Sequence, residues 1–275
     1  MNTNRRTLHF LVLTAIFLFL TAWTQATVDQ YYALFKAVEP VPNLTQEFPD
    51  TDYNDAYAFQ EALIDRFAAD GDPVIGYKVG LTGPQLPFGA EEPIYGRLYD
   101  SMVVAPNNKI FRSDYIIPMV EIELAFIFGE DVTYPVTQAE LAAKVVAVAP
   151  AVEFPDLLFE DLPNLFWLDI IAMNVSPRQV IIGQPIPIDQ VDVNNIQVTV
   201  RQKNQIINQG VSTNVLGDQW ESLLFLVERL DSRGYQIQAG DVVMTGAMSG
   251  MFPAAPGHYH VQYENLGKLR FKVVE

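Results

Sequence analysis

Two hydrophobic periods alternate along the chain, and each predicts a different kind of element. The stretch DAYAFQEALIDRFAADGD spaces its apolar residues at helical intervals before Gly71 and Pro73, which predicts a helix that ends there. VIGYKVGLTG, YGRLYDSMVV and IIPMVEIELAFIFG are instead short runs rich in apolar and β-branched residues and broken by glycine or proline. These three runs predict strands.

Two further helices are expected in the middle and late parts of the chain. In TQAELAAKVVAVAP, Thr137 is the N-cap and Glu140 follows three residues later, the pattern of a capping box, and Pro150 closes the segment. The second helix covers roughly residues 219–232 and stops at Gly234.

Strand patterns dominate the second half of the chain. IQVTVRQKNQIINQG alternates on both sides of Lys203-Asn204, and YHVQYENLGKLRFKVVE turns near residues 265–267, so both segments predict hairpins. GDVVMTGAMSG is typical of a strand that runs into a glycine-rich loop. A few scattered helices among many strands favour one α+β domain built around a mixed, strongly curved β-sheet, with no linker to divide it.

Residues 1–26 differ from the rest of the chain. They have an arginine pair, an apolar run from Phe10 to Leu20 and a small-residue end at Ala26, which is the order of a secretory signal peptide. Cleavage would give an exported protein, periplasmic or secreted, whose helical N-terminal part covers residues 27–72. The alternative is that the segment is kept as a membrane anchor.

Composition and charge limit the classes of partner that the protein could bind. The chain of 275 residues is 49% hydrophobic, enough for a sizeable core, and carries a formal net charge of −16. Nucleic acids and anionic membrane surfaces attract basic patches, so this acidic balance argues against both as partners. The chain has no cysteine, so stability must come from the core, a bound ion or oligomerisation.

The most unusual polar residues lie in VEIELAF, residues 120–126. Side chains alternate in a strand, so Glu121 and Glu123 share one face while Ile122, Leu124 and Phe126 share the other. A solvated face would explain the pair, although apolar residues continue along that face. Two carboxylates in a partly dry place need protonation or a cation.

A third carboxylate, Glu153, lies in the apolar stretch VVAVAPAVEFPD. Considered alone, it fits a surface residue or one half of a salt bridge. Three carboxylates in apolar contexts would offer an incomplete octahedron of oxygen ligands, which suits a hard ion such as Mg²⁺, Mn²⁺ or Ca²⁺.

Two glycine-flanked segments could hold an anionic ligand. Lys78 of GYKVGLTG is either a solvated loop lysine or an ammonium that pairs with a substrate anion or acts in proton transfer. Gly80 would let backbone amides approach such a ligand. In TGAMSG, Thr245 and the amides of Gly246 and Ala247 could hold a carboxylate.

Five blocks in order, GYKVGLT, YGRLYDSMV, VEIELAFIFG, PAVEF and GDVVMTGAM, resemble the fumarylacetoacetate hydrolase superfamily, in its 2-oxopent-4-enoate hydratase and 4-oxalocrotonate decarboxylase branch. The resemblance covers roughly residues 73–275, which are expected to form the catalytic domain. It implies a β-roll fold of the fumarylacetoacetase C-terminal-domain type and a divalent metal, Mg²⁺ or Mn²⁺. It also implies a homo-oligomer.

The resemblance implies roles for five polar residues. Glu121, Glu123 and Glu153 occupy the positions of metal ligands. Lys78 and Asp100 occupy the positions of catalytic residues, and Asp100 is implied in proton transfer.

For the substrate, the resemblance implies binding at Gly80 and Leu81 and a carboxylate site at Thr245, Gly246 and Ala247. The implied substrate is a small 2-oxo acid, and the implied reaction is hydration of a 2-hydroxydienoate. In this implied reaction the ion would hold the carboxylate and the 2-oxygen, the dienol would ketonise, and water would add to the conjugated enone.

Two short segments depart from the resemblance and leave other functions open. AMN at residues 172–174 stands where relatives often carry ADN, and LGDQ at 216–219 stands where they often carry an LGHP-like stretch. Metal-dependent decarboxylation of a 2-oxo acid needs no new residue type and remains an alternative, as does an exported, non-catalytic 2-oxo-acid-binding protein. C–C hydrolysis is disfavoured because outside the signal segment only His258 and His260 could serve as a histidine base.

Overall fold

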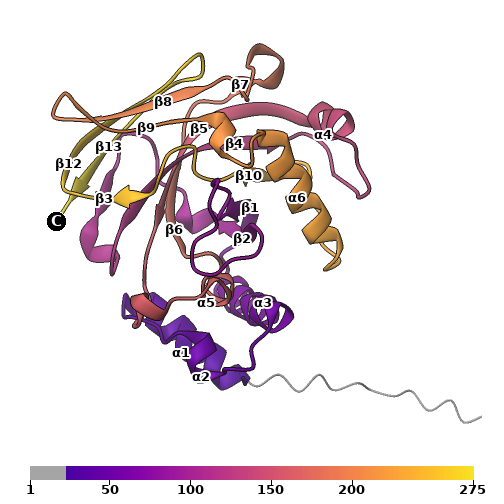
Figure 1. The fold of residues 1–275 in the computed structure, drawn as a ribbon, viewed down its shortest axis with the longest axis vertical. Coiled ribbons are helices and arrows are strands. Elements are labelled where there is room, and N and C mark those ends of the chain that lie inside the picture. The colour runs from indigo at the N-terminus through magenta and orange to yellow at the C-terminus, as the bar shows by residue number, and fades with distance from the viewer. Residues whose placement is uncertain (1–22) are drawn as a thin grey trace, which may run out of the picture.

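The computed structural model describes residues 23–275, in which a curved wall of strands stands above a layer of helices (Figure 1). The helices are α1 (Gln25–Ala37), α2 (Leu44–Glu47), α3 (Tyr53–Ala69), α4 (Gln138–Lys144), α5 (Trp167–Ala172) and α6 (Gln219–Asp231). The strands are β1 (Val74–Gly80), β2 (Ile94–Tyr99), β3 (Lys109–Phe111), β4 (Met119–Phe128), β5 (Val145–Pro155), β6 (Pro177–Ile182), β7 (Ile186–Pro187), β8 (Gln197–Gln202), β9 (Gln205–Val211), β10 (Val242–Met244), β11 (Phe252–Pro253), β12 (Gly257–Tyr263) and β13 (Gly267–Val274).

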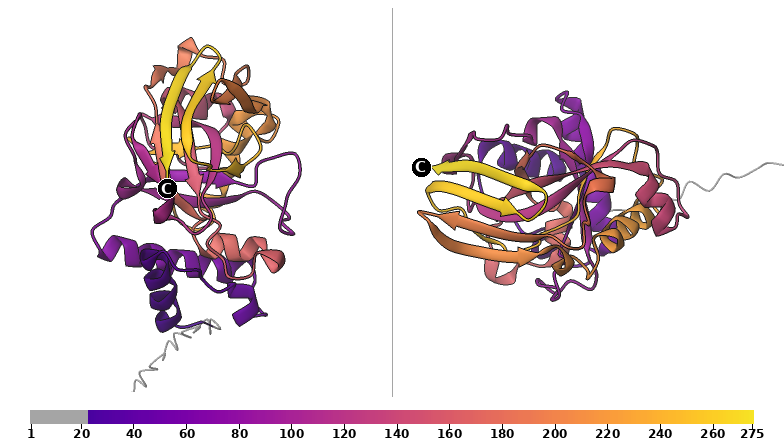
Figure 2. Two further views of the ribbon diagram at one scale, coloured as in Figure 1. Left: turned by 90° about the vertical axis from the view of Figure 1, so that its left-hand side faces the viewer. Right: turned by 90° about the horizontal axis from the view of Figure 1, so that it is seen from above.

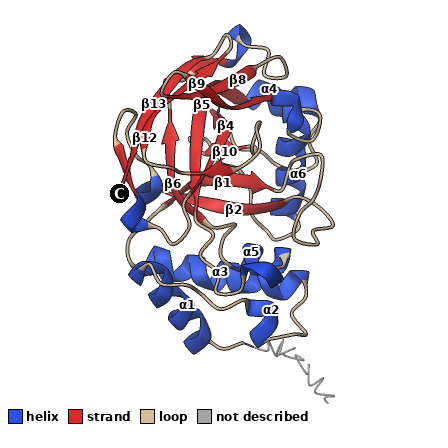
Figure 3. Ribbon diagram, turned by 60° about the vertical axis from the view of Figure 1, so that its left-hand side comes forward, coloured by secondary structure: helices blue, strands red, loops and turns tan. Residues whose placement is uncertain are grey.

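Within this range the strands form two sheets. One has the order β2-β1-β10-β4-β5-β6, with β11 joined to β4 and β7 to β5, and the other has the order β3-β13-β12-β8-β9. In the first sheet β1 pairs with β10 in parallel and the other main pairs are antiparallel, so the sheet is mixed. The strands curl strongly and the helices lie outside them (Figure 3), which confirms the predicted α+β class.

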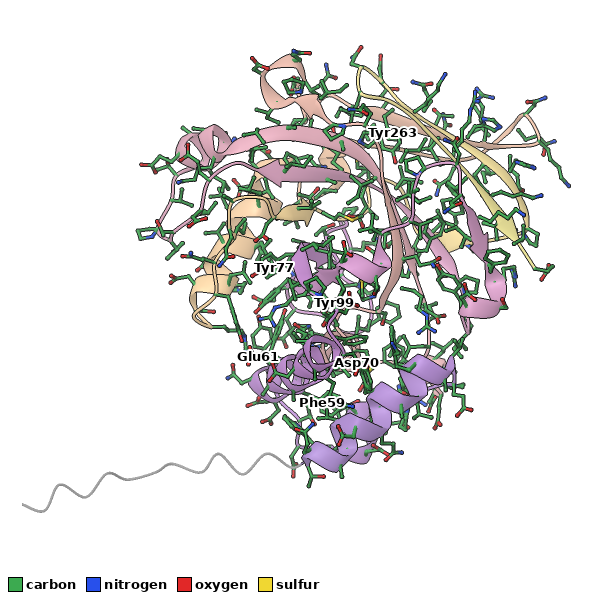
Figure 4. The ribbon with its side chains drawn as sticks, turned by 180° about the vertical axis from the view of Figure 1, so that it is seen from behind. Phe59, Glu61, Asp70, Tyr77, Tyr99 and Tyr263 are labelled. Atoms are coloured by element: carbon green, nitrogen blue, oxygen red, sulfur yellow. The ribbon has the colours of Figure 1, made fainter. Side chains whose placement is uncertain are left out.

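The long strands β4 and β5 form the centre of the first sheet. Their register places Glu121 opposite Glu153, and Ile122 between the two glutamates of β4 is fully buried. The hydroxyl of Tyr263, at the end of β12, donates to the Ala151 carbonyl of β5 and joins the second sheet to the first (Figure 4). Residues 148–155 of β5 are all buried.

The helices α1, α2, α3 and α5 form a layer below the strands, next to β2 (Figure 2). Aromatic pairs join the two: Tyr57 of α3 stacks on Tyr95 of β2, and Phe67 of α3 lies against Tyr99, with ring centroids 4.7 Å apart in each pair. Figure 4 shows Tyr99 between the strands and this helical layer. The division at residue 73 into a helical part and a catalytic domain stays a prediction.

The helix expected at residues 137–150 is shorter than predicted. Its capping box is confirmed, since the Thr137 hydroxyl accepts from the Glu140 amide at 3.3 Å. The prediction of its end was wrong, because α4 stops at Lys144 and Val145 begins β5. VVAVAP is rich in β-branched residues and pairs with β4 on one side and β7 or Gly183 on the other, so tertiary pairing outweighs the local helical pattern.

The other expected turns and helix ends are confirmed. Lys203 and Asn204 have φ values of 49° and 64° in the tight turn between β8 and β9, as a two-residue hairpin turn requires. Asn265 and Gly267 have φ values of 59° and 123° in the turn between β12 and β13. Gly234 follows α6 with a φ of 77°, which fits its expected role as a helix stop.

The predicted signal peptide or anchor lies mostly outside the described residues. Trp23 is the first residue that the structure describes, and its ring meets that of Phe59 edge-on with ring centroids 5.2 Å apart. The Thr24 hydroxyl caps α1 by accepting from the Thr27 amide at 3.4 Å. Cleavage at Ala26 would remove both contacts. None of the helices between residues 23 and 275 has the length and hydrophobicity that a membrane span needs.

Replacing Gly96 of β2 by alanine should destabilise the protein. A Cβ at Gly96 would lie 2.4 Å from the backbone oxygen of Asn174, so the backbone must shift. We expect a loss of about 1–3 kcal/mol in the free energy of unfolding, measured by denaturant titration. Gly250→Ala is the matched control, because a Cβ there meets nothing within 4 Å. Equal stabilities of the two variants would contradict this packing.

Candidate functional site

Three carboxylates meet where β4 and β5 pair. Glu121 and Glu123 lie two residues apart on β4, and Glu153 lies on β5 opposite Glu121. One oxygen from each carboxylate lies within 4.8 Å of the others. Glu123 and Glu153 are buried and Glu121 is half-buried. The grouping expected from the sequence is therefore present, although ligation by these residues stays a prediction.

Burial makes this cluster unfavourable while all its members are charged. Burial, together with the charge of Glu153, raises the pKa of Glu121 to about 7. Burial also raises the pKa of Glu123 well above its ordinary value, and the charges of Glu153 and Glu121 raise it further. The Oε2 atom of Glu153 is buried and has no hydrogen-bond partner among residues 23–275. A buried, unpartnered carboxylate oxygen beside two others favours a cation at this point.

Lys78 of β1 supplies part of the missing positive charge. It is 2% exposed, and its Nζ donates to Glu153 Oε1 and, at 3.1 Å, to the Val175 carbonyl. Burial alone would lower the pKa of Lys78, but the charges of Glu153, Glu121 and Glu123 outweigh this effect and raise it. Lys78 is therefore a buried ammonium and not a solvated loop lysine.

The donor set fits a divalent cation. The three carboxylates and the Lys78 ammonium together leave two negative charges when all are ionised. Oxygen ligands in an incomplete shell are those that Mg²⁺, Mn²⁺ and Ca²⁺ prefer. The Oε2 atom of Glu153 provides an oxygen that no group in the described residues satisfies.

A cavity of about 490 Å³ opens onto the cluster. Lys78, Glu121 and Glu123 line it together with Ser176 and Ser249, two buried serines whose hydroxyls have no hydrogen-bond partner in the described part of the chain. Buried hydroxyls are usually hydrogen-bonded, so these two are available to a ligand oxygen or to water. The sequence did not indicate either serine, because a single serine in a loop carries no periodic or motif signal.

Three of the five residues expected to bind substrate line this cavity: Gly80, Leu81 and Ala247. Gly80 is closely packed, since a Cβ there would lie 2.7 Å from Val175 Cγ1. Leu81 has a φ of 56°, which turns the chain sharply at the end of β1. Their contact with a substrate stays a prediction.

The other two residues, Thr245 and Gly246, serve the protein itself. The Gly246 amide donates to Glu123 Oε2 at 2.9 Å and so holds that carboxylate in place. The Thr245 hydroxyl is fully buried and donates to the side-chain oxygen of Gln219. Both donors are thus engaged within the protein, and their contact with a substrate carboxylate stays a prediction.

Asp100 is not brought to the cavity. It begins a short 3₁₀ turn, η1 (Asp100–Met102), is exposed, and donates its amide to the Pro73 carbonyl at 3.0 Å. Lys78 pairs with Gly96 in the β1–β2 register, and a strand advances about 3.3 Å per residue, so Asp100 lies roughly 13 Å further along. Asp100 does not line the cavity either. Its exposed position outside the cavity lining gives the predicted role in proton transfer no support, and that role stays a prediction.

A strained turn forms the cavity wall beside Lys78. Asn174, Val175 and Ser176 have successive φ values of 55°, 61° and 54°, a left-handed conformation that is costly for the β-branched Val175. The Asn174 side chain fixes the turn, because its Oδ1 accepts from the Arg97 amide at 2.7 Å and its Nδ2 donates to the Arg97 carbonyl at 2.9 Å. The turn places the Val175 carbonyl against Lys78 and Ser176 on the cavity wall.

The two positions that depart from the resemblance have structural roles. Met173 is 2% exposed and belongs to the apolar core. Asp218 caps α6, since its Oδ1 accepts from the Trp220 amide at 2.8 Å and from the Asn194 side chain at 2.7 Å. Neither residue lines the cavity.

The chain is similar in sequence to known enzymes that share one family profile. Residues 85–274 match the profile of the fumarylacetoacetate (FAA) hydrolase C-terminal family. A similar protein is the 2-keto-4-pentenoate hydratase of Paraburkholderia phymatum, 30% identical over 237 residues, which are 84% of this chain and 90% of that protein. Another is the 4-oxalocrotonate decarboxylase of Pseudomonas sp. strain CF600, 30% identical over 252 residues, which are 87% of this chain and 95% of that protein.

Solved structures with the same fold also exist. The 4-oxalocrotonate decarboxylase from Pseudomonas putida G7, complexed with magnesium and adipate, superposes with a TM-score of 0.87 at 27% identity and covers 91% of this chain and 97% of its own. The same enzyme complexed with calcium and acetate superposes with a TM-score of 0.85 at 28% identity and covers 91% of this chain and 96% of its own.

Adding Mg²⁺ or Mn²⁺ to the metal-free protein should raise its melting temperature, and EDTA should reverse the rise. An ion that binds only the folded state stabilises it by about 2.7 kcal/mol at a hundredfold excess over Kd. Glu123→Gln should lose most of the rise, because it removes a charged oxygen ligand. Differential scanning fluorimetry measures both.

The matched control for this experiment is Glu264→Gln, an exposed glutamate in the turn between β12 and β13. It should keep the full metal-dependent rise. An equal rise in Glu123→Gln, or no rise in the unaltered protein, would show that the carboxylate cluster is not a cation site.

Proposed function

Because this chain belongs to the fumarylacetoacetate hydrolase family, as its five sequence blocks indicated, we propose that it is a divalent-metal-dependent hydratase that adds water to a 2-hydroxydienoate. The main support for this proposal is structural. Three carboxylates surround the buried Lys78 at a cavity large enough for an organic acid. Several relatives named 2-keto-4-pentenoate hydratase support the choice of reaction.

Glu121, Glu123 and Glu153 would hold one Mg²⁺ or Mn²⁺ ion. Once bound, the ion supplies a Lewis acid that stabilises negative charge on the 2-oxygen of the acid. The protein's part is to hold the ligands in place: the Gly246 amide orients Glu123, and Lys78 orients Glu153. Similar structures complexed with magnesium or calcium support this class of ion.

Lys78 would donate to the 2-oxygen of the substrate. An ammonium has three donors, and Glu153 and the Val175 carbonyl engage two of them, so one remains for a ligand in the cavity. During ketonisation the 2-hydroxyl loses a proton and C5 gains one. The remaining Lys78 donor stabilises the charge that the 2-oxygen carries between these two transfers.

Ser176 and Ser249 would bind and orient the water that adds. Both hydroxyls are buried on the cavity wall without a partner among residues 23–275, and each can donate to or accept from one water. The water oxygen bonds to C4 of the enone and a proton goes to C3, so one molecule of water is added.

Decarboxylation of a 2-oxo acid is the second candidate function. The fold similarity to 4-oxalocrotonate decarboxylase favours it, and it would use the same carboxylate cluster and Lys78. The two functions differ in the acid that they take, because 4-oxalocrotonate carries a carboxylate at each end.

We further propose that the protein is exported, on the support of the signal-like order of residues 1–26. The mature chain would begin at or before Trp23, because Trp23 packs on Phe59 and Thr24 caps α1. Mass spectrometry of the chain recovered after export tests this. A mature chain that begins at Thr27 would contradict the proposed boundary, and an intact chain in the membrane fraction would support the anchor instead. Homo-oligomer assembly stays a prediction.

With Mg²⁺ or Mn²⁺, the purified protein should consume 2-hydroxypenta-2,4-dienoate, followed as loss of dienol absorbance. Lys78→Met should lower kcat/KM by roughly 10²–10³-fold, because it removes the donor to the 2-oxygen. A parallel assay with 4-oxalocrotonate identifies the decarboxylase alternative. Metal-dependent binding of both acids without turnover of either would refute the enzyme and leave a binding protein.

Asp100→Asn should leave kcat/KM nearly unchanged, because Asp100 is exposed and does not line the cavity. Ser176→Ala should lower kcat/KM by roughly tenfold, the effect of one lost hydrogen bond of about 1.4 kcal/mol. The same dienol assay measures both variants. A large loss in Asp100→Asn with normal activity in Ser176→Ala would contradict this assignment of the site.

A further inference from the structure

The part of the cavity beyond the carboxylates has no positive charge. Among the described residues that line it, Lys78 is the only cation, and it already donates to Glu153 and Val175. Gln85 and Asn214 also line the cavity, but neutral amides do not neutralise a carboxylate. The other walls are largely apolar, formed by Leu81, Phe88, Leu157, Phe159, Ile170 and Met251.

This apolar wall extends well beyond the carboxylates. The segment that follows β5 lines the cavity with Leu157 and Phe159, and Phe159 forms an isolated β-bridge with Val41, which precedes α2 of the helical layer. The cavity volume of about 490 Å³ is that of pockets which hold drug-sized ligands, larger than a five-carbon acid needs.

Backbone contacts hold this wall in place. The Phe88 carbonyl accepts from the Trp167 amide of α5 at 2.9 Å. The Leu158 carbonyl, next to Phe159, accepts from the Val41 amide at 2.8 Å. The backbone of both segments is thus tied to the helical layer, so the apolar part of the cavity is present in the ligand-free structure.

We propose that the substrate of this enzyme carries a single carboxylate and an apolar alkyl or aryl tail at its far end, which lies against Leu157 and Phe159. This inference rests on the proposed function for the acid end of the substrate. A second carboxylate at the far end, as in 4-oxalocrotonate, would be placed in the apolar part without a cationic partner, which is strongly unfavourable. The cavity therefore selects against the decarboxylase substrate.

The test compares the binding of saturated 2-oxo acids to the Mg²⁺-loaded protein by calorimetry. In 2-oxoadipate a carboxylate replaces the terminal methyl group of 2-oxohexanoate, so this pair isolates the second charge. We expect 2-oxohexanoate to bind at least roughly tenfold more tightly than 2-oxoadipate. We expect 2-oxooctanoate to gain up to roughly fourfold for each added CH₂. Equal or tighter binding of 2-oxoadipate would overturn the proposal.

Two variants test where the tail lies. Leu157→Arg and Met251→Arg each bring a cation to the apolar wall and should shift the preference towards 2-oxoadipate. Met251 is 36% exposed, so its replacement is expected to fold even if Leu157→Arg does not. Ile206→Arg on β9 is the control, because Ile206 is 46% exposed and does not line the cavity. An unchanged preference in the folded wall variants would show that the tail does not lie there.

The binding assay separates this inference from the proposed function, because saturated 2-oxo acids cannot be hydrated. A preference for 2-oxohexanoate without hydration of any dienoate would refute the proposed function alone. Hydration of 2-hydroxypenta-2,4-dienoate with no preference against 2-oxoadipate would refute the inference alone.

Discussion

The buried ion pair between Lys78 and Glu153 is the interaction on which the site depends. Lys78 lies on β1 and Glu153 on β5, and the strands β10 and β4 lie between them in the sheet. In a flat sheet with strands about 4.8 Å apart, these two strands would be roughly 14 Å from each other. The side chains meet because the sheet curls strongly (Figure 3), so the curvature of the fold brings the ammonium to the carboxylates. The charge of Lys78, in direct contact with Glu153, offsets part of the free energy that it costs to remove three clustered carboxylates from water.

The surrounding contacts keep this arrangement in one geometry. The Gly246 amide holds Glu123, and the strained turn at Val175 offers Lys78 a carbonyl. Asn174 stabilises the strained turn through both backbone groups of Arg97. Left-handed backbone at a β-branched residue persists only where its surroundings enforce it, and here the enforced geometry is that of the site. The remaining imbalance, two negative charges and an unpartnered Glu153 oxygen, is what a divalent cation would satisfy.

The sequence was sufficient to predict the carboxylates that strand alternation places on one face. It was not sufficient to predict which motif residues point into the cavity. Glu121 and Glu123 could be placed on one face because the strand period is two, and Glu153 could be added because it interrupts an apolar run. Asp100 and Thr245 occupy positions that the resemblance marks, yet position in a motif does not determine where a side chain points. The strand β5 was mistaken for the end of a helix, because its pairing with distant segments has no local signal. The same limit hid the serines of the cavity, which come together only in the folded chain.

The most direct test of this account is the stoichiometry of Mn²⁺ binding to the metal-free protein, followed by electron paramagnetic resonance of the free ion. We expect one tight Mn²⁺ site per chain. Mg²⁺ should displace the bound Mn²⁺, and the site should be lost when Glu121 and Glu123 are both replaced by glutamine. No tight site in the unaltered protein would contradict this account, as would a site that survives this double replacement.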